Sequence, residues 1–313
     1  MKRRFVYFML FSAVFVISSC NNDAVISESI TNESPCRYLQ VSPDEEDALA
    51  ELATTMHALN YQMVNDEYAM KKSFWSWLKK LWKPVVTIAA DVVGTVAGGG
   101  NLLAGGVASS VVGGAAFLGA DVVVGANVGV TVPIHPRRIA FNGVVCPSTP
   151  ENQTMNLSDS IGYYHNAILY DIMTDSCALS NCKTQQDLID LVVQKMESVC
   201  ADELGLDENE RLQQIQLATN ISSTLMDVLN SSNSFEEFMD GLKAKNIVSP
   251  AVIDVLQEYC IGLLSVNIED NDGKYLQEIL DKIRKSNLSA TTKLAIGNAC
   301  IVGNASNQLW IKE

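Results

Sequence analysis

Side chains that commonly carry chemistry are sparse in this sequence. It has three histidines in 313 residues, and no H-E-x-x-H metal motif, G-x-S-x-G nucleophile turn or glycine-rich phosphate loop occurs. His165 shares one helical face with isoleucines, which favours a buried structural histidine over a general base. A nucleophile pair of His165 and Cys177 would need a tertiary proximity that spacing does not show. We therefore predict a protein that is not an enzyme and that uses no cofactor or metal.

Eight cysteines offer a second kind of chemistry. Cys177 and Cys182 are close in sequence, but no second close cysteine pair or cysteine–histidine pair is present to complete a zinc site. The two are interpreted as small buried residues or as a local disulfide. Seven cysteines follow Cys20, so at least one of them stays free or pairs between chains.

Cys20 lies at the end of a leader-like segment. A cationic start, residues 2–4, is followed by an apolar stretch, 5–17, and then by Ser18, Ser19 and Cys20. Small residues before a cysteine at this place resemble the lipobox of bacterial lipoproteins. The resemblance implies cleavage before Cys20, acylation of its thiol and amine, and stable anchoring through more than one acyl chain. An ordinary signal peptide with an incidental cysteine is the alternative.

The charge balance limits the class of partner. The formal net charge is −14, the sequence pI is about 4.6, and charged residues form 19% of the chain. A nucleic-acid-binding protein normally presents a basic surface, so we predict no nucleic acid partner. The composition is too apolar for a disordered chain and too polar for a polytopic membrane protein.

One short segment, residues 71–84, has the opposite character. It holds three of the four tryptophans and five lysines, and no acidic residue. On a helix, its aromatic and leucine side chains fall on one arc and its lysines on the opposite arc. Such a helix suits a membrane–water interface, with contacts from Trp75, Trp77, Leu78, Lys79, Lys80, Leu81, Trp82 and Lys83. The alternative is that its tryptophans pack on the protein's own core.

The following segment, residues 85–130, is rich in glycine, alanine and valine. Its only charges are Asp91 and Asp121, and the 29 residues between them exceed the length that crosses a bilayer. The glycines at 98–100 predict a break between two helices, about 85–97 and 102–120. Two placements stay open: membrane association, with both acids near headgroups or paired, and burial in a soluble domain. The predicted helix-packing positions are Gly94, Gly98, Gly106 and Gly114.

The rest of the chain is predicted to be mainly α-helical. After a polar tether, a helix is expected from Pro43 to about residue 68. Alternating apolar residues from 128 and an Asn142-Gly143 turn predict a short β-hairpin. Helix-start signals then predict a C-terminal α-helical bundle whose helices begin near Thr184, Asp207, Ser234, Ser249, Asp272 and Ser289.

The predicted organisation has six parts. They are a signal peptide (1–19), the lipidated Cys20 with a flexible tether (20–41), amphipathic helices (42–84), a hydrophobic hairpin (85–130), a β-element and linker (131–150) and an α-helical domain (151–313). This layout is similar to that of uncharacterised lipoproteins of Bacteroidetes and of glycine-zipper lipoproteins of Gram-negative outer membranes. The shared features are Cys20, the glycine spacing and Tyr164-His165-Asn166. Leu102 and the triple glycine depart from a regular zipper, and the resemblance implies no catalytic residue.

The leading hypothesis is a non-enzymatic, acyl-anchored envelope lipoprotein. Its membrane-lipid contacts are expected through Cys20 and residues 71–130, and its helical domain is expected to be an exposed interaction module. Asn21 after the cysteine gives no signal for inner-membrane retention, so the outer membrane is the predicted location. One alternative is a membrane-active effector that permeabilises bilayers. The second alternative is a soluble helical binding domain with the glycine-rich segment as its buried core.

Overall fold

The structure is a computed structural model with helices over most of the residues it describes. The described residues are 39, 41–63, 82–101, 103–108, 110–111, 161–175, 178, 181–182, 184–204, 207–265 and 274–310. All of them fall in one unit of the chain, Cys36–Glu313. These ranges contain no strand, and the prediction of a mainly α protein is confirmed. The β-hairpin predicted within 128–145 lies outside the described residues.

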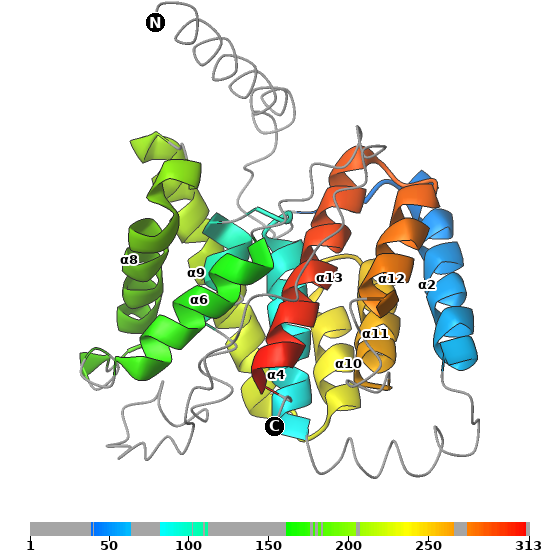
Figure 1. Ribbon diagram of the computed structural model, residues 1–313, viewed down its shortest axis with the longest axis horizontal. Helices are drawn as coiled ribbons and strands as arrows, with labels where there is room; N and C mark the ends of the chain where they lie inside the picture. Colours follow the sequence, from blue (N-terminus) through cyan, green and yellow to red (C-terminus); the bar gives the residue numbers. More distant parts are fainter. Residues whose placement is uncertain are drawn as a thin grey trace, which may run out of the picture. The chain divides into compact units, whose positions relative to one another are not determined.

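The helices follow one another along the chain as shown in Figure 1. They are α2 (Pro43–Met63), α4 (Trp82–Ala97), α6 (Ile161–Thr174), α8 (Gln185–Leu204), α9 (Glu208–Ser231), α10 (Phe235–Lys245), α11 (Pro250–Ser265), α12 (Lys274–Lys285) and α13 (Ala290–Trp310). Residues 103–108 and 110–111 are helical as well.

Local capping explains where several helices begin. Asp207 and Glu210 form a reciprocal capping box at the start of α9. The hydroxyl oxygen of Ser234 accepts the backbone N–H of Glu237 in α10, and that of Ser289 accepts the N–H of Thr292 in α13. These starts confirm the corresponding sequence predictions.

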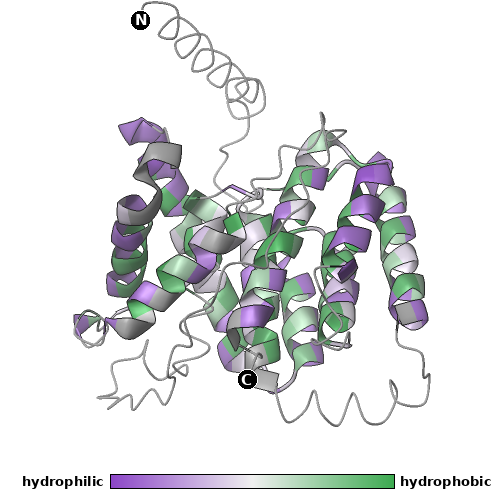
Figure 2. Ribbon diagram, viewed as in Figure 1, coloured by the Kyte–Doolittle hydropathy of each residue, from purple (hydrophilic) through white to green (hydrophobic). Residues whose placement is uncertain are grey.

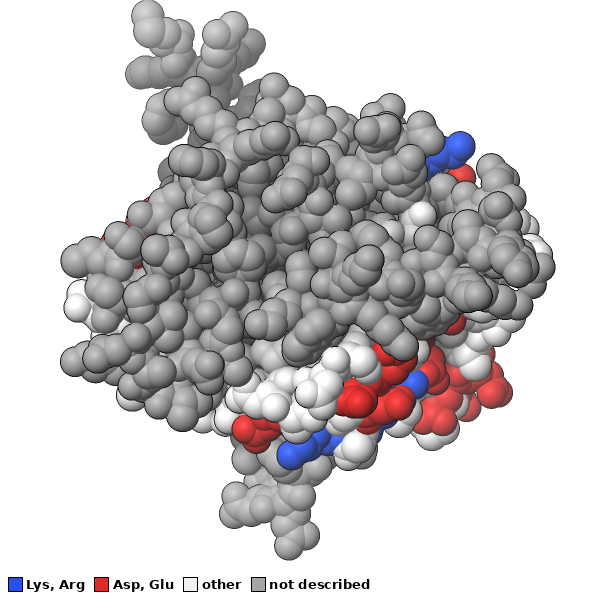
Figure 3. Space-filling view, turned by 90° about the horizontal axis from the view of Figure 1, so that it is seen from below, with Lys and Arg blue, Asp and Glu red and all other residues white. Residues whose placement is uncertain are grey.

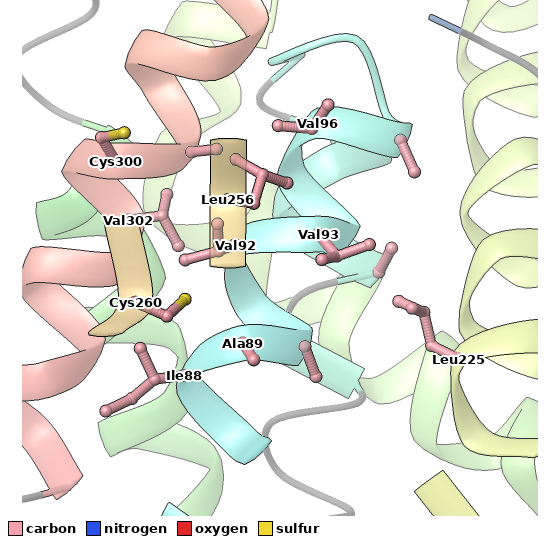
Figure 4. Packing of buried hydrophobic residues seen from close by; sticks show 14 of the residues in the cluster. Ile88, Ala89, Val92, Val93, Val96, Leu225, Leu256, Cys260, Cys300 and Val302 are labelled. Atoms are coloured by element: carbon pink, nitrogen blue, oxygen red, sulfur yellow. The ribbon is translucent and has the colours of Figure 1, made fainter. Parts of the chain in front are cut away.

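Helix α4 lies in the middle of the core. Every side chain from Val85 to Ala97 is at most 1% exposed. The helices that pack on it are α13, α11, α9 and α10. Figure 4 shows its valines between Leu256 and Val302 on one side and Leu225 on the other. A helix that is apolar all round needs such complete enclosure, because every face gains from leaving water.

The outer helices carry the hydrophilic residues. Figure 2 shows hydrophilic positions on α8 and α12, whereas α4 is mostly hydrophobic. Helix α12 has the clearest division, because Leu276, Ile279, Leu280 and Ile283 are buried while lysines lie in its last turn. Helix α2 packs on α11 and α12. The segments 42–84, 85–130 and 151–313, which the sequence separates by character, therefore contribute described helices to one shared core.

The chain turns sharply after α4 at three glycines. Gly99 and Gly100 have φ angles of 70° and 71°, in the left-handed region that favours glycine. A Cβ on Gly98 would overlap the backbone N and Cα of Gly105, and one on Gly105 would lie 3.0 Å from the carbonyl oxygen of Thr95. The helical residues that start at 103 thus pack directly on the end of α4, as a helical hairpin requires.

Candidate functional site

The candidate site is a group of buried polar side chains around α4. Asp91, at the middle of α4, is 0% exposed. The hydroxyl of Ser306 on α13 donates to its Oδ2 over 2.6 Å. Nε2 of His165 on α6 lies 3.3 Å from the same oxygen. These three residues, called the Asp91 cluster below, connect three helices through one carboxylate.

A second layer of contacts orients His165. Its Nδ1 lies 3.0 Å from Oδ1 of Asn166, whose Nδ2 donates to the carbonyl of Ala305 over 2.8 Å. The amide of Asn166 is therefore fixed with its oxygen toward the imidazole ring. The Nε2 contact with Asp91 has an ion-pair distance but lacks the alignment of a hydrogen bond. Asp91 itself has further interactions beyond these two.

Two glycines allow α4, α6 and α13 to approach one another closely near the Asp91 cluster. A Cβ on Gly162 of α6 would lie 3.1 Å from the Cβ of Ala305, and one on Gly303 of α13 would lie 2.6 Å from Val92. Larger residues at either position would separate α6 or α4 from α13. The close approach is what brings His165 and Ser306 to the same carboxylate oxygen.

The arrangement differs from a hydrolytic triad. In a triad the histidine lies between serine and carboxylate, and it takes the serine proton. Here Ser306 and His165 both contact Asp91 Oδ2, and Ser306 donates to the carboxylate directly. All three side chains are at most 1% exposed. The cluster is therefore suited to fixing the rotation of α4 about its axis, because Asp91 must face both His165 of α6 and Ser306 of α13.

A second polar cluster links the surface to the core. Asn60 donates to the carbonyl of Glu258 over 2.8 Å and accepts the O–H of Tyr275 over 2.8 Å. Nδ1 of His57 lies 3.1 Å from Oε2 of Glu258. We call these four residues the Asn60 cluster. Gly262 leaves the space for it, because a Cβ there would overlap both Tyr275 Oη and Asn60 Oδ1.

The described thiols are in poorly reactive surroundings. Cys182, Cys260 and Cys300 are free, which leaves Cys182 outside any local disulfide. Burial raises the pKa of Cys260 to about 12 and raises that of Cys300 well above the usual range. Burial, together with the negative charge of Asp187, also raises the pKa of Cys182. All three stay protonated at neutral pH, so they are weak nucleophiles. In the described part of the chain, no group of three His, Cys, Asp or Glu side chains could hold a metal ion.

The structure describes only some of the site residues that the sequence predicts. Cys20, Gly114 and the predicted interface residues Trp75, Trp77, Leu78, Lys79, Lys80 and Leu81 lie outside the described residues. Trp82 and Lys83 belong to the first turn of α4, and their side chains are not described. Gly94 is buried within α4, and a Cβ on Gly106 would lie 2.8 Å from Cε of Met196. Leu102 is also outside the described residues.

Sequence reasoning placed His165 in the core but did not find its partner. Its face is buried as expected, with Ile161, Ile168 and Ile172 at most 2% exposed. The available signal was complementarity: Asp91 is the one charge between Val85 and Ala97, and His165 is the one basic group on an apolar face. The Asn60 cluster gave no such signal, since asparagine and tyrosine are common on half-buried helices.

The described surface is mainly acidic where charged side chains gather. Figure 3 shows the molecule from below, and acidic side chains of described residues gather along the lower edge of this view, with a few basic ones beside them. Within the described ranges, no helix combines the length and the apolar character that a membrane crossing requires. No family model, curated protein or solved structure matches the chain.

Proposed function

We propose that this protein is a non-enzymatic, acyl-anchored lipoprotein of the bacterial outer membrane, and that its helical unit is a binding module. In this proposal, Cys20 carries the lipid, and the valine-rich helix α4 is a core element of the module. The observation that supports the place of α4 in the core is the complete burial of Val85 to Ala97, with the Asp91 carboxylate in contact with His165 and Ser306.

The energetics of α4 favour the protein core over a bilayer. In membrane insertion, each of its six valine and isoleucine residues in 85–97 gains only about 0.3–0.6 kcal/mol, while a central aspartate costs about 2.5–3.5 kcal/mol. The sum is close to zero. In a protein core, each fully buried valine or isoleucine gains about 1.5–3 kcal/mol. The core therefore offers α4 more than a membrane does, as long as Asp91 keeps its partners.

Membrane contact beyond the acyl chains is then assigned to residues 71–84, which run into the first turn of α4. In this segment, Trp75, Trp77 and Trp82 share one helical arc, and lysines occupy the other. Lysines near an anionic surface gain about 1 kcal/mol each. This segment would hold the module close to the lipid surface without requiring α4 to leave the core.

Liposome binding tests this division of roles. The unacylated chain from Asn21 is mixed with anionic vesicles that contain a self-quenched dye, and binding and dye release are recorded. We expect binding without dye release, and weaker binding when Trp75, Trp77 and Trp82 are replaced by serine. Hydrogen exchange should leave the amides of 85–97 equally protected with and without vesicles. Dye release, together with loss of that protection, would support a membrane-permeabilising effector instead.

Acyl labelling tests the anchor separately. Cells that express the full chain are grown with a labelled fatty acid, and a Cys20→Ala variant serves as the control. Label on the parent chain and none on the variant is the expected result. A parent chain that is cleaved, exported and unlabelled would instead identify an ordinary signal peptide.

A further inference from the structure

We propose that the Asp91 cluster is a pH-sensitive switch, in which the contact between His165 and Asp91 keeps a proton that the unfolded chain loses in neutral to mildly alkaline solution. Packing of α6 and α13 around Asp91 of α4 is then coupled to the uptake of one proton. The inference goes beyond the proposed function, because it depends neither on the acyl anchor nor on the location of the chain. It follows from which side-chain atoms of the cluster can donate a hydrogen bond and which can only accept one.

The amide of Asn166 determines the protonation of one ring nitrogen. Its Nδ2 donates to the carbonyl of Ala305 over 2.8 Å, so its Oδ1 is the atom that lies 3.0 Å from Nδ1 of His165. An amide oxygen can only accept a hydrogen bond, so Nδ1 must carry a proton. In a neutral imidazole the other nitrogen is then an acceptor without a proton. A neutral His165 would therefore present an Nε2 lone pair to its neighbour.

The neighbour of Nε2 is the Asp91 carboxylate, whose contacts fit the ionised form. Ser306 donates to Oδ2 over 2.6 Å, within the range of about 2.5–2.7 Å for a hydroxyl bonded to an ionised carboxylate. Nε2 of His165 lies 3.3 Å from the same oxygen, and the two side chains are 1% and 0% exposed. An unprotonated nitrogen and an ionised oxygen would repel each other there, with little screening by solvent. A proton on Nε2 converts this repulsion into an ion pair.

No other charge among the described buried side chains can replace this proton. Asp91 and His165 are the only buried members of the Asp, Glu, Lys, Arg and His classes among them. The helices packed on α4 and α6 bring half-buried charged groups that have partners of their own, namely Lys195, Arg211, Lys243, Glu258 and Lys293. These helices also bring three buried groups that stay neutral. Tyr259 donates its O–H to the carbonyl of Cys300, and burial raises the pKa of the Cys260 and Cys300 thiols.

The proton couples the stability of the fold to pH in a defined direction. In the unfolded chain, a histidine loses its proton above about pH 6.5. The folded chain holds that proton on His165, so it binds one proton more than the unfolded chain, and its stability falls as the pH rises. The stabilisation is fully present in mildly acidic solution and is lost in alkaline solution as the pair releases its proton.

Nuclear magnetic resonance of the ring nitrogens tests the proton directly. The full chain is labelled with isotopic histidine and carries His57→Gln and His135→Gln, so that His165 is its single histidine. In the folded chain at about pH 8, both ring nitrogens should have the chemical shifts of protonated nitrogen. The same chain in denaturant should show one unprotonated nitrogen. An unprotonated Nε2 in the folded chain at this pH would overturn the proposal.

The pH dependence of unfolding tests the coupling. Denaturant unfolding is recorded between about pH 7 and pH 9 for the parent and for the double variant Asp91→Leu with His165→Leu, which lacks the titrating pair. The ratio of the unfolding equilibrium constant of the parent to that of the double variant should rise about ten-fold for each pH unit, because unfolding of the parent releases one extra proton. His57→Gln is the matched control, since it removes an exposed histidine, and it should follow the parent.

The same pH dependence for the parent and the double variant would overturn the proposal. So would a ratio that falls as the pH rises, because the pair would then release its proton on folding. The resonance measurement does not require the double variant, so a failure of that variant to fold still leaves the proposal open to contradiction.

Discussion

The two polar clusters hold helices together under different conditions. In the Asp91 cluster, a carboxylate, an imidazole and a hydroxyl are all at most 1% exposed. In the Asn60 cluster, the most buried members, Asn60 and Tyr275, are neutral, while Glu258 is 23% and His57 68% exposed. A charge that water cannot reach depends on its partners, whereas a neutral amide depends on the geometry of its hydrogen bonds.

This difference predicts how each cluster responds to change. The Asp91 cluster should be sensitive to the loss of one member and tolerant of the loss of all. The Asn60 cluster should be sensitive to shape, because Tyr275 and Gly262 fit against each other, and insensitive to its exposed histidine. The effect of each substitution on the two clusters and on comparable surface contacts is measured as the free energy of unfolding in denaturant.

His165→Leu should have the largest effect. It removes the one basic group beside the buried carboxylate, so we expect a loss of about 3–5 kcal/mol. Adding Asp91→Leu removes the charge itself and should recover most of that loss. If the double variant is no more stable than His165→Leu, the damage is to packing, and the cluster has no special dependence on charge pairing.

Gly262→Ala should be the most damaging small change in the Asn60 cluster. Its Cβ would overlap Tyr275 Oη and Asn60 Oδ1, so the hydrogen bond between them must break or α12 must shift. We expect a loss of about 1–3 kcal/mol. Tyr275→Phe removes the nearest of the three overlapping atoms, the hydroxyl oxygen, and keeps the ring carbon Cζ, so the double variant should lose less than the sum of the single ones. Strict additivity would show that the two residues do not interact.

Glu45 provides a solvent-accessible counterpart to Asp91. Partial burial would raise the pKa of this carboxylate, but hydrogen bonds from Ser289, Thr292 and Ser42 outweigh it and lower the pKa. A carboxylate whose pKa is lowered by folding stabilises the fold above its unfolded-state pKa, and that contribution disappears as the pH falls through the folded-state value. Glu45→Gln should cost about 1 kcal/mol at neutral pH, discounted for solvent screening. The difference from the parent should vanish in acid; a difference that persists there would contradict this account.

His57→Ala should have the smallest effect. The imidazole is 68% exposed, and its contact with Glu258 is a surface ion pair that depends on protonation. Such pairs contribute little, so we expect a change within about 0.5 kcal/mol. Lys195→Ala is a useful reference, because Lys195 contacts both Asp171 and Asp175 and joins α8 to α6. A larger loss of unfolding free energy for His57→Ala than for Lys195→Ala would contradict this, and would show that the hydrogen bonds of Asn60 and Tyr275 depend on His57.

The sequence was sufficient for features that depend on neighbours along the chain. Helix starts at Asp207, Ser234 and Ser289 follow from side-chain oxygens that accept nearby backbone N–H groups. The turn at Gly98 to Gly100 follows from a backbone conformation that favours glycine. In each case the physical cause lies within four residues, where spacing carries the information.

The sequence was insufficient for contacts between distant segments. Asp91 meets Ser306, 215 positions away, and Asn60 meets Tyr275, also 215 positions away. Apolar periodicity shows that α4 needs enclosure but not which helices enclose it, because lipid and protein both satisfy an apolar face. The pairing of Gly98 with Gly105, rather than with the regularly spaced Gly106, likewise depends on the angle at which the chain turns.

The place of α13 in the chain has a consequence for the order of folding. It packs on α4 and α6 and contacts α11 and α12, although it is the last helix in the sequence. Contacts of such long sequence separation form slowly, because much of the chain must be ordered before they can be made. The core therefore closes only after the final twenty or so residues have been made, so the chain stays loosely structured until its last helix is available to pack.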